Sequence, residues 1–215
     1  SRRCNSGSAM SAMNGGIELS DLEAFRQDAR AWLAANCPAS MRGRMVHIED
    51  IHEAYGTADA RLWLERAAAR NWVAPGWPTQ YGGGGLNGAQ QRVLREEMTA
   101  IKAVPPWFDL GLVMIGPTLL EFGTEAQKLR HLPRIARGEV RWCQGFSEPG
   151  AGSDLASLRT RGVLQGDHFV INGQKIWTSG AEHAQWMFCL VRTDPDAPKH
   201  DGISFVLLEM NQPGV

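Results

Sequence analysis

The most informative stretch of this sequence is Trp142-Cys-Gln-Gly-Phe-Ser-Glu-Pro-Gly-Ala-Gly-Ser-Asp154, a short apolar run that stops in a loop of very small residues. Gly150, Ala151 and Gly152 leave the backbone nearly bare, so its N–H groups can approach a ligand closely. Ser147 and Ser153 add hydroxyl groups that donate or accept hydrogen bonds. Such a loop suits an anion such as a pyrophosphate, or the edge of an aromatic cofactor. A plain turn between two strands is the alternative.

A second segment, Asn172-Gly-Gln-Lys-Ile-Trp-Thr-Ser-Gly180, follows some twenty residues later. Asn-Gly is the preferred dipeptide of a two-residue hairpin turn, and the flanking runs 168–171 and 174–178 have strand-like composition. The pattern therefore predicts a hairpin that returns Trp177 and Ser179 toward the first loop. Trp177 would lie flat against an aromatic cofactor, and the Ser179 hydroxyl would reach a ring nitrogen.

Together these motifs resemble the acyl-CoA dehydrogenase superfamily. The segment Gly145-Phe-Ser-Glu-Pro-Gly-Ala-Gly-Ser-Asp-Leu-Ala-Ser157 is similar to the signature loop of that family, and Asn172-Gly-Gln-Lys-Ile-Trp177 is similar to its following hairpin. Two more segments extend the resemblance over roughly residues 18–215: Gly76-Trp-Pro-Thr-Gln-Tyr-Gly-Gly83 and Gly123-Thr-Glu-Ala-Gln-Lys128. The sequence departs from the family at Phe146, usually a smaller aliphatic residue, and at Ser179, often Thr. Neither change removes the expected contact.

The resemblance implies an FAD-dependent enzyme that removes the α-proton and the β-hydride of an acyl-CoA thioester, with the flavin taking the hydride. Gln144, Phe146 and Ser147 would line the pyrimidine side of the flavin ring and the region near N5. Trp177 would cover the ring system, and Ser179 would reach N5.

Ser153 would meet the pyrophosphate of the cofactor or the CoA part of the substrate, and residues 108–114 would help to wall an acyl channel. No catalytic residue is assigned in this chain. The family's carboxylate base lies in a C-terminal helical domain, and the sequence ends at Val215, at or near the end of the expected β domain. Glu148 in the signature loop has a structural role by the same resemblance. The chain alone is therefore expected to be inactive.

The partners implied by the resemblance are an acyl-CoA substrate, an electron-transfer flavoprotein or similar acceptor, and further copies of the chain in a dimer or tetramer. Two alternatives remain open. The chain could be a non-catalytic partner subunit or binding module of the same fold, or it could belong to the acyl-CoA oxidases or flavin monooxygenases built on that fold. Acyl chain length and branching are not determined by these residues.

Composition narrows the class of protein. A hydrophobic content of 43% and a charged content of 21% are typical of a globular protein, and a net charge of -1 gives no electrostatic basis for binding nucleic acid. There is no apolar run of about 18 residues, so no membrane span is expected. The four cysteines are scattered without a Cys-x-x-Cys pair, so neither a zinc or other metal site nor a disulfide framework is expected. Reduced thiols in the cytoplasm are therefore expected.

The spacing of apolar residues predicts an α+β protein of several domains: a flexible tail over 1–16, an all-α domain over 17–138 and an antiparallel β-sheet or barrel over 139–215. Helical periodicity covers 20–37, 58–71, 87–103 and 124–138, and a buried helix is expected over 107–122. From residue 139 the period changes to two. The expected strands are 140–146, 158–164, 168–171, 174–178, 184–191 and 203–208.

Overall fold

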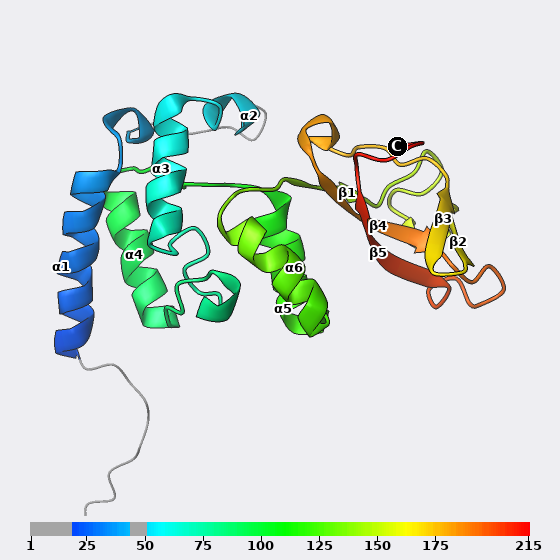
Figure 1. The fold of residues 1–215 in the computed structure, drawn as a ribbon, viewed down its shortest axis with the longest axis horizontal. Helices are drawn as coiled ribbons and strands as arrows, with labels where there is room; N and C mark the ends of the chain where they lie inside the picture. Colours follow the sequence, from blue (N-terminus) through cyan, green and yellow to red (C-terminus); the bar gives the residue numbers. More distant parts are fainter. Residues whose placement is uncertain (1–18, 44–50) are drawn as a thin grey trace, which may run out of the picture.

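The structure is a computed structural model that describes residues 19–43 and 51–215. The first part of the chain is helical, the last part is a β-sheet, and α5 (Gly116–Phe122) and α6 (Glu125–Ala136) lie between the two (Figure 1). This arrangement confirms the predicted order of a helical part followed by a β part. The predicted tail over 1–16 lies outside the described residues.

The other helices before the sheet are α1 (Leu19–Asn36), α2 (Ile51–Ala54), α3 (Ala58–Ala69), α4 (Gly88–Ala100) and the π-helical turn η4 (Gly111–Ile115), together with short 3-10 turns at Ala39–Met41 and Thr79–Tyr81. Capping boxes open two of the helices, with Asn87 and Gln90 at α4 and Thr124 and Gln127 at α6. The expectation of one buried helix over 107–122 is confirmed in part. Residues 110–122 are continuously helical, with η4 leading directly into α5, but residues 107–109 are not helical, and Val113, Met114 and Phe122 are exposed.

The helices α1, α3 and α4 enclose the first hydrophobic core. Trp63 of α3 is fully buried there, and its indole N–H donates to the carbonyl oxygen of Val104 at 2.9 Å. Arg26 and Arg30 of α1 hold the buried carboxylate of Glu97 on α4, with N–O distances of 3.0 and 2.8 Å. The core and the ion pairs together keep the two long helices side by side (Figure 1).

The sheet consists of β1 (Trp142–Gly145), β2 (Arg161–Gln165), β3 (His168–Asn172), β4 (Trp186–Arg192) and β5 (Ile203–Glu209). The strands follow the order β1-β4-β2-β3, and β5 pairs with the long strand β4. Strands β2 and β3 are antiparallel, as are β4 and β5, but β4 runs parallel to both β1 and β2. The prediction of a purely antiparallel sheet is therefore wrong. The long connection 146–185 returns the chain to the start of β1, so that β4 runs in the same direction.

The predicted hairpin at Asn172-Gly173 is also wrong. β3 pairs with β2 across the turn at Gly166-Asp167, and residues 174–178 form no strand. Gly173 serves a close approach instead, because a Cβ atom at this position would lie 2.3 Å from the Thr160 hydroxyl oxygen. The chain after Asn172 therefore crosses close to Thr160 and runs on to the loop that follows β1.

A second core joins the helices to the sheet. Leu132 and Ile135 of α6 have no exposed surface and pack in one cluster with Trp142 of β1 and with Trp186 and Phe188 of β4. This core fixes β1, and with it the loop that follows β1, against the helical part. In residues 19–43 and 51–215, no helix is both long enough and apolar enough to cross a bilayer.

We expect Leu132→Ala to lower the free energy of unfolding by about 3 kcal/mol, because it leaves a cavity in the core that joins α6 to the sheet. Leu129→Ala on the same helix is the matched control. Its side chain is 55% exposed, and its loss should change the free energy of unfolding by no more than about 0.5 kcal/mol. Chemical denaturation of both variants makes the measurement, and equal effects would contradict the placement of this core.

Candidate functional site

The loop after β1 turns back on itself at Pro149-Gly150. The backbone N–H of Glu148 donates to the carbonyl oxygen of Ala151 at 2.9 Å, and the N–H of Ala151 donates to that of Glu148 at 3.0 Å. Gly150 and Gly152 are exposed, with nothing within 4 Å of the space that a Cβ atom would occupy. Gly150 and Gly152 therefore present bare backbone on the surface, as predicted from the sequence, whereas Ala151 is buried and uses both of its backbone polar groups within the turn.

A buried carboxylate anchors this loop. Glu148 accepts hydrogen bonds from the Lys175 ammonium at 2.8 Å and from the backbone N–H groups of Arg159 at 2.7 Å and Thr160 at 2.9 Å. Burial by itself raises the pKa of the Glu148 carboxyl, but these hydrogen bonds outweigh burial and bring the pKa down to about 2. Glu148 is thus a fixed anion, which agrees with a structural role.

The same contacts bring the second motif to the first. Lys175 also donates to the carbonyl oxygen of Phe146 at 3.1 Å, and the backbone N–H of Ile176 donates to that of Ser147 at 2.9 Å. Trp177 and Ser179 follow directly after these two bonds. The sequence therefore predicted the meeting of the two motifs, but it predicted the wrong backbone path between them.

Trp177 is the most unusual residue of the second motif. Its side chain is 86% exposed, and its backbone adopts φ +60°, a left-handed conformation that bulky residues rarely adopt. Its carbonyl oxygen accepts a hydrogen bond from the N–H of Ser179 at 3.0 Å. An exposed indole on a strained backbone points to a ligand that covers the ring, because strain of this kind gathers at binding sites.

The other predicted contacts lie along β1 and the loop. Gln144 of β1 and Ser147 are half-buried, whereas Ser153 and Ser179 are exposed. The ring of Phe146 turns inward onto Phe188 and Phe205, with ring centroids 5.8 and 6.3 Å away. Any contact from Phe146 to a ligand would therefore run through its backbone.

Groups that could bind a ligand remain unused around the loop. Within the described chain, the backbone N–H groups of Gly152 and Ser153 donate to no protein acceptor, and the buried hydroxyl of Thr178 has no partner. On the far side of the loop, Lys199 binds Asp154 at 2.5 Å. Free N–H groups beside exposed hydroxyls form a donor set suited to phosphate oxygens.

Sequence reasoning assigned no role to Lys175, although this lysine links the two motifs. Its ammonium is buried, and a buried ammonium needs an anionic partner. That need was the available signal, since Glu148 is the acidic residue at the centre of the loop. The role of Thr178 had no such signal, because the burial of its hydroxyl depends on the path of the backbone.

We expect Glu148→Gln to lower the free energy of unfolding by about 3 kcal/mol at neutral pH, because it leaves the Lys175 ammonium buried without a counter-charge. The folded pKa of Glu148, about 2, lies below its ordinary value of 4.5. The stabilisation is therefore complete above about pH 4.5 and is lost as the pH falls toward 2.

The difference in the free energy of unfolding between the wild-type chain and Glu148→Gln should accordingly become smaller below pH 4.5. Denaturant titrations at several pH values make the measurement, with the exposed Glu182→Gln as the control. A gap that stays constant down to pH 3 would show that the Glu148 charge contributes nothing.

Both parts of the sequence match known protein families. Residues 20–139 match the family description "Acyl-CoA dehydrogenase, N-terminal domain", and residues 143–215 match "Acyl-CoA dehydrogenase, middle domain". The chain is 42% identical over 203 residues to acyl-CoA dehydrogenase IpdE1 of Mycobacterium tuberculosis, a match that covers 92% of this chain and 51% of that protein. The chain thus spans about half the length of the curated relatives it matches.

Solved structures show the same likeness. The Tcur3481-Tcur3483 steroid ACAD superposes with a TM-score of 0.68 at 38% identity, over 92% of this chain and 50% of that one. The ChsE4-ChsE5 complex from Mycobacterium tuberculosis superposes with a TM-score of 0.64 at 34% identity, over 90% of this chain and 48% of that one. With both sequence domains matched and the fold shared, this chain belongs to the acyl-CoA dehydrogenase family.

Proposed function

We propose that this chain forms the flavin-facing part of an FAD-dependent acyl-CoA dehydrogenase, which introduces an α,β double bond into an acyl-CoA thioester. The observation that carries the proposal is the exposed indole of Trp177, held beside the loop after β1 by the Glu148–Lys175 pair. A plain turn between strands has no need of an exposed tryptophan on a strained backbone. Membership of the family supplies the reaction class.

The donor set of the site fits FAD. An exposed indole face suits a flat ring system, and free backbone N–H groups with exposed hydroxyls suit a pyrophosphate. In this proposal Gln144, Phe146 and Ser147 line the pyrimidine side of the ring and Trp177 covers it. Ser179 offers its hydroxyl near N5.

Ser153 contacts the pyrophosphate or the CoA portion of the substrate. Bound FAD would accept the hydride from the β-carbon. The contribution of this chain is to position the ring and to supply hydrogen bonds along its edge.

The proton acceptor is not assigned to this chain. Glu148 is the carboxylate nearest the centre of the loop, but three donors hold it and its pKa is about 2, so it is a poor base at neutral pH. We propose that the base comes from protein beyond these 215 residues, and that the chain alone does not turn over substrate.

Substrate and partners follow the relatives. The likeness to the Tcur3481-Tcur3483 steroid ACAD makes the CoA thioester of a steroid-derived acid the first substrate to test, beside a straight-chain acyl-CoA. An electron-transfer flavoprotein or a similar acceptor and an oligomeric assembly belong to the same proposal. A cytoplasmic location agrees with Cys37, Cys143 and Cys189, which carry free thiols.

A second candidate is a non-catalytic subunit of a two-component enzyme. It is favoured by the likeness to two-component assemblies such as the ChsE4-ChsE5 complex. In that case a second chain would supply the base, while this chain would supply the loop and Trp177. The two candidates differ in whether a single polypeptide that contains this sequence reduces its own flavin.

The direct test is a visible absorbance spectrum of the longest natural polypeptide that contains this sequence, with intact mass measured in parallel. We expect a flavin spectrum that bleaches when an acyl-CoA thioester is added without oxygen. Flavin that binds but does not bleach until a second subunit is added would select the partner-subunit candidate. A polypeptide that binds no flavin, alone or with its partner, would contradict the proposal.

We expect Trp177→Ala to weaken flavin binding about tenfold, because the ring loses its aromatic cover. Phe122→Ala is the matched control, since Phe122 is also a highly exposed aromatic residue but lies on α5, away from the loop. Flavin fluorescence titration measures the affinity of each variant. An unchanged flavin affinity in Trp177→Ala would contradict the proposal that the indole covers the flavin ring.

A further inference from the structure

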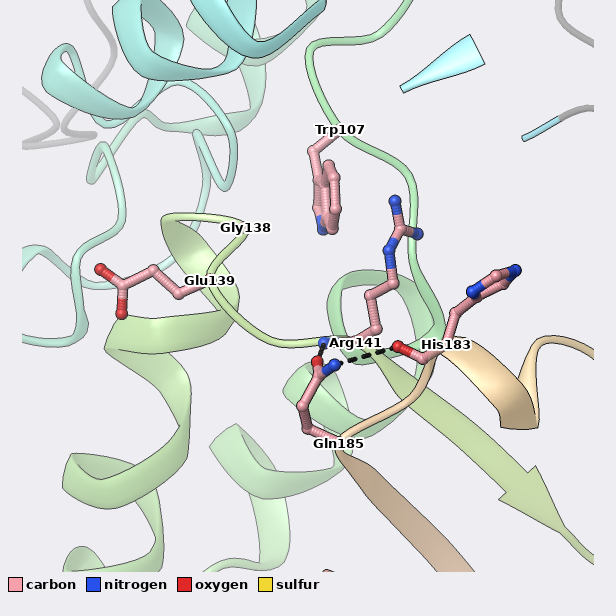
Figure 2. Close-up of a pocket in the computed structure, with 6 residues that line it drawn as sticks. All are labelled: Trp107, Gly138, Glu139, Arg141, His183 and Gln185. Atoms are coloured by element: carbon pink, nitrogen blue, oxygen red, sulfur yellow. Dashed lines mark hydrogen bonds between the residues drawn. The ribbon is translucent and has the colours of Figure 1, made fainter. Parts of the chain in front are cut away.

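A cavity lies at the other end of β1, away from the loop that follows this strand. It has a volume of about 360 Å³ and is lined by Trp107, Gly138, Glu139, Arg141, His183 and Gln185 (Figure 2). Arg141 directly precedes β1 and Gln185 directly precedes β4, and these strands are parallel. The cavity is therefore at their amino ends, whereas the loop after β1 is at the carboxyl end. The flavin contacts proposed above include none of its residues.

Two residues that line this cavity carry unused donors. Trp107 is buried, and its indole N–H has no hydrogen-bond partner in the part of the chain that the structure describes. The guanidinium of Arg141 stacks on the same indole, 4.2 Å from the ring centroid, and donates to no acceptor among the residues that the structure describes. An unsatisfied buried N–H costs about 1–3 kcal/mol unless water or a ligand accepts from it.

The charges around the cavity leave Arg141 as its unbalanced cation. The Glu139 carboxylate is held by Arg137 at 3.1 Å, and in Figure 2 it points away from both Arg141 and Trp107. Asp109 attracts Arg141 at longer range, but its carboxylate accepts hydrogen bonds from the backbone N–H groups of Gly111 and Trp142. Burial lowers the pKa of Arg141, as expected of a cation that lacks a close counter-charge.

Two hydrogen bonds fix the orientation of the Gln185 amide. Its oxygen accepts from the Arg141 backbone N–H at 2.8 Å, and its nitrogen donates to the His183 carbonyl oxygen at 3.1 Å. These two bonds, drawn in Figure 2, hold the Gln185 side chain in place at the edge of the cavity. The Arg141 guanidinium lies over the indole face and can direct its N–H groups to an acceptor in its own plane.

We propose that this cavity binds a carboxylate, with the Arg141 guanidinium as its ion-pair partner and the Trp107 indole N–H as a second donor. A planar monoanion matches one planar, fork-shaped cation better than a tetrahedral dianion does. The volume corresponds to roughly a dozen water molecules, so it also holds the body of a small organic acid. The carboxylate belongs either to a free acid or to the far end of an acyl-CoA.

The test is proton–nitrogen NMR of the isotope-labelled protein, with the Trp107 indole cross-peak assigned from its absence in Trp107→Phe. Sodium succinate is the probe, and sodium chloride at matched ionic strength is the blank. We expect a saturable shift of the Trp107 peak. The indole N–H of Trp142 is also buried and unpartnered but lies outside this cavity, so its peak is an internal control that should stay in place.

Arg141→Gln should weaken the succinate response about tenfold or more, and Arg141→Lys should weaken it less, because lysine keeps the charge but loses the fork. Arg95→Gln, an exposed arginine on α4, should respond like the wild type. If Arg141→Gln loses its folded spectrum, the Arg141→Lys comparison carries the test alone. The proposal would be overturned if succinate caused no saturable shift, or if the Arg141 variants kept the shift in full. It would also be overturned if inorganic phosphate bound more tightly than succinate.

The source of the carboxylate is then resolved with CoA thioesters. The thioester of a dicarboxylic acid is compared with that of the monocarboxylic acid of equal length. A shift at lower concentration with the dicarboxylic thioester than with succinate supports the far end of an acyl-CoA as the source. A stronger response to succinate supports a free acid. Because the readout is the Trp107 peak, failure here leaves the flavin proposal untouched.

Discussion

The buried ion pair between Glu148 and Lys175 is the contact on which the geometry of the candidate site depends. It ties the loop after β1 to a segment more than twenty residues later and satisfies the backbone of Arg159 and Thr160 at the same time. Burying two charges has a desolvation cost that their attraction offsets only when the hydrogen bonding is complete. Here the carboxylate has three donors and the ammonium has a second acceptor, so the pair specifies one arrangement of the loop.

The loop is also positioned by the core that joins the helices to the sheet. His131 of α6 lies against Trp142 and Trp186, with ring centroids 5.2 and 4.7 Å away, and Trp186 carries Arg130 above its ring. Burial, together with neighbouring arginines, lowers the pKa of His131 to about 4, so the imidazole is neutral at physiological pH and packs as an aromatic ring. The start of β1 is thereby fixed to α6, while its end carries the loop.

The parallel strands β1 and β4 thus have a proposed ligand site at each end. At the carboxyl end, small residues, exposed hydroxyls and Trp177 form the proposed flavin site. At the amino end, Trp107 and Arg141 face a cavity beside the helical part. The first residues of both strands, Trp142 and Trp186, sit in the core that joins the helices to the sheet, so packing fixes the positions of the two ends. Such an arrangement places both sites on elements that packing fixes, which favours precise ligand geometry.

The sequence by itself determined the elements that depend on local chemistry. Thr124 and Gln127 predicted the start of α6, the change of period near residue 139 predicted the sheet, and the small residues after Gly145 predicted a bare loop. The proximity of the two motifs was predicted as well, but from a hairpin at Asn172-Gly173 that does not form. What tertiary structure decided was the path between these elements. Asn172-Gly173 has the composition of a turn, yet close packing against Thr160 and the attraction of Lys175 to Glu148 draw the chain across to the loop. The parallel direction of β4 and the cavity at Trp107 and Arg141 likewise arise from contacts between residues far apart in the chain, which no local pattern encodes.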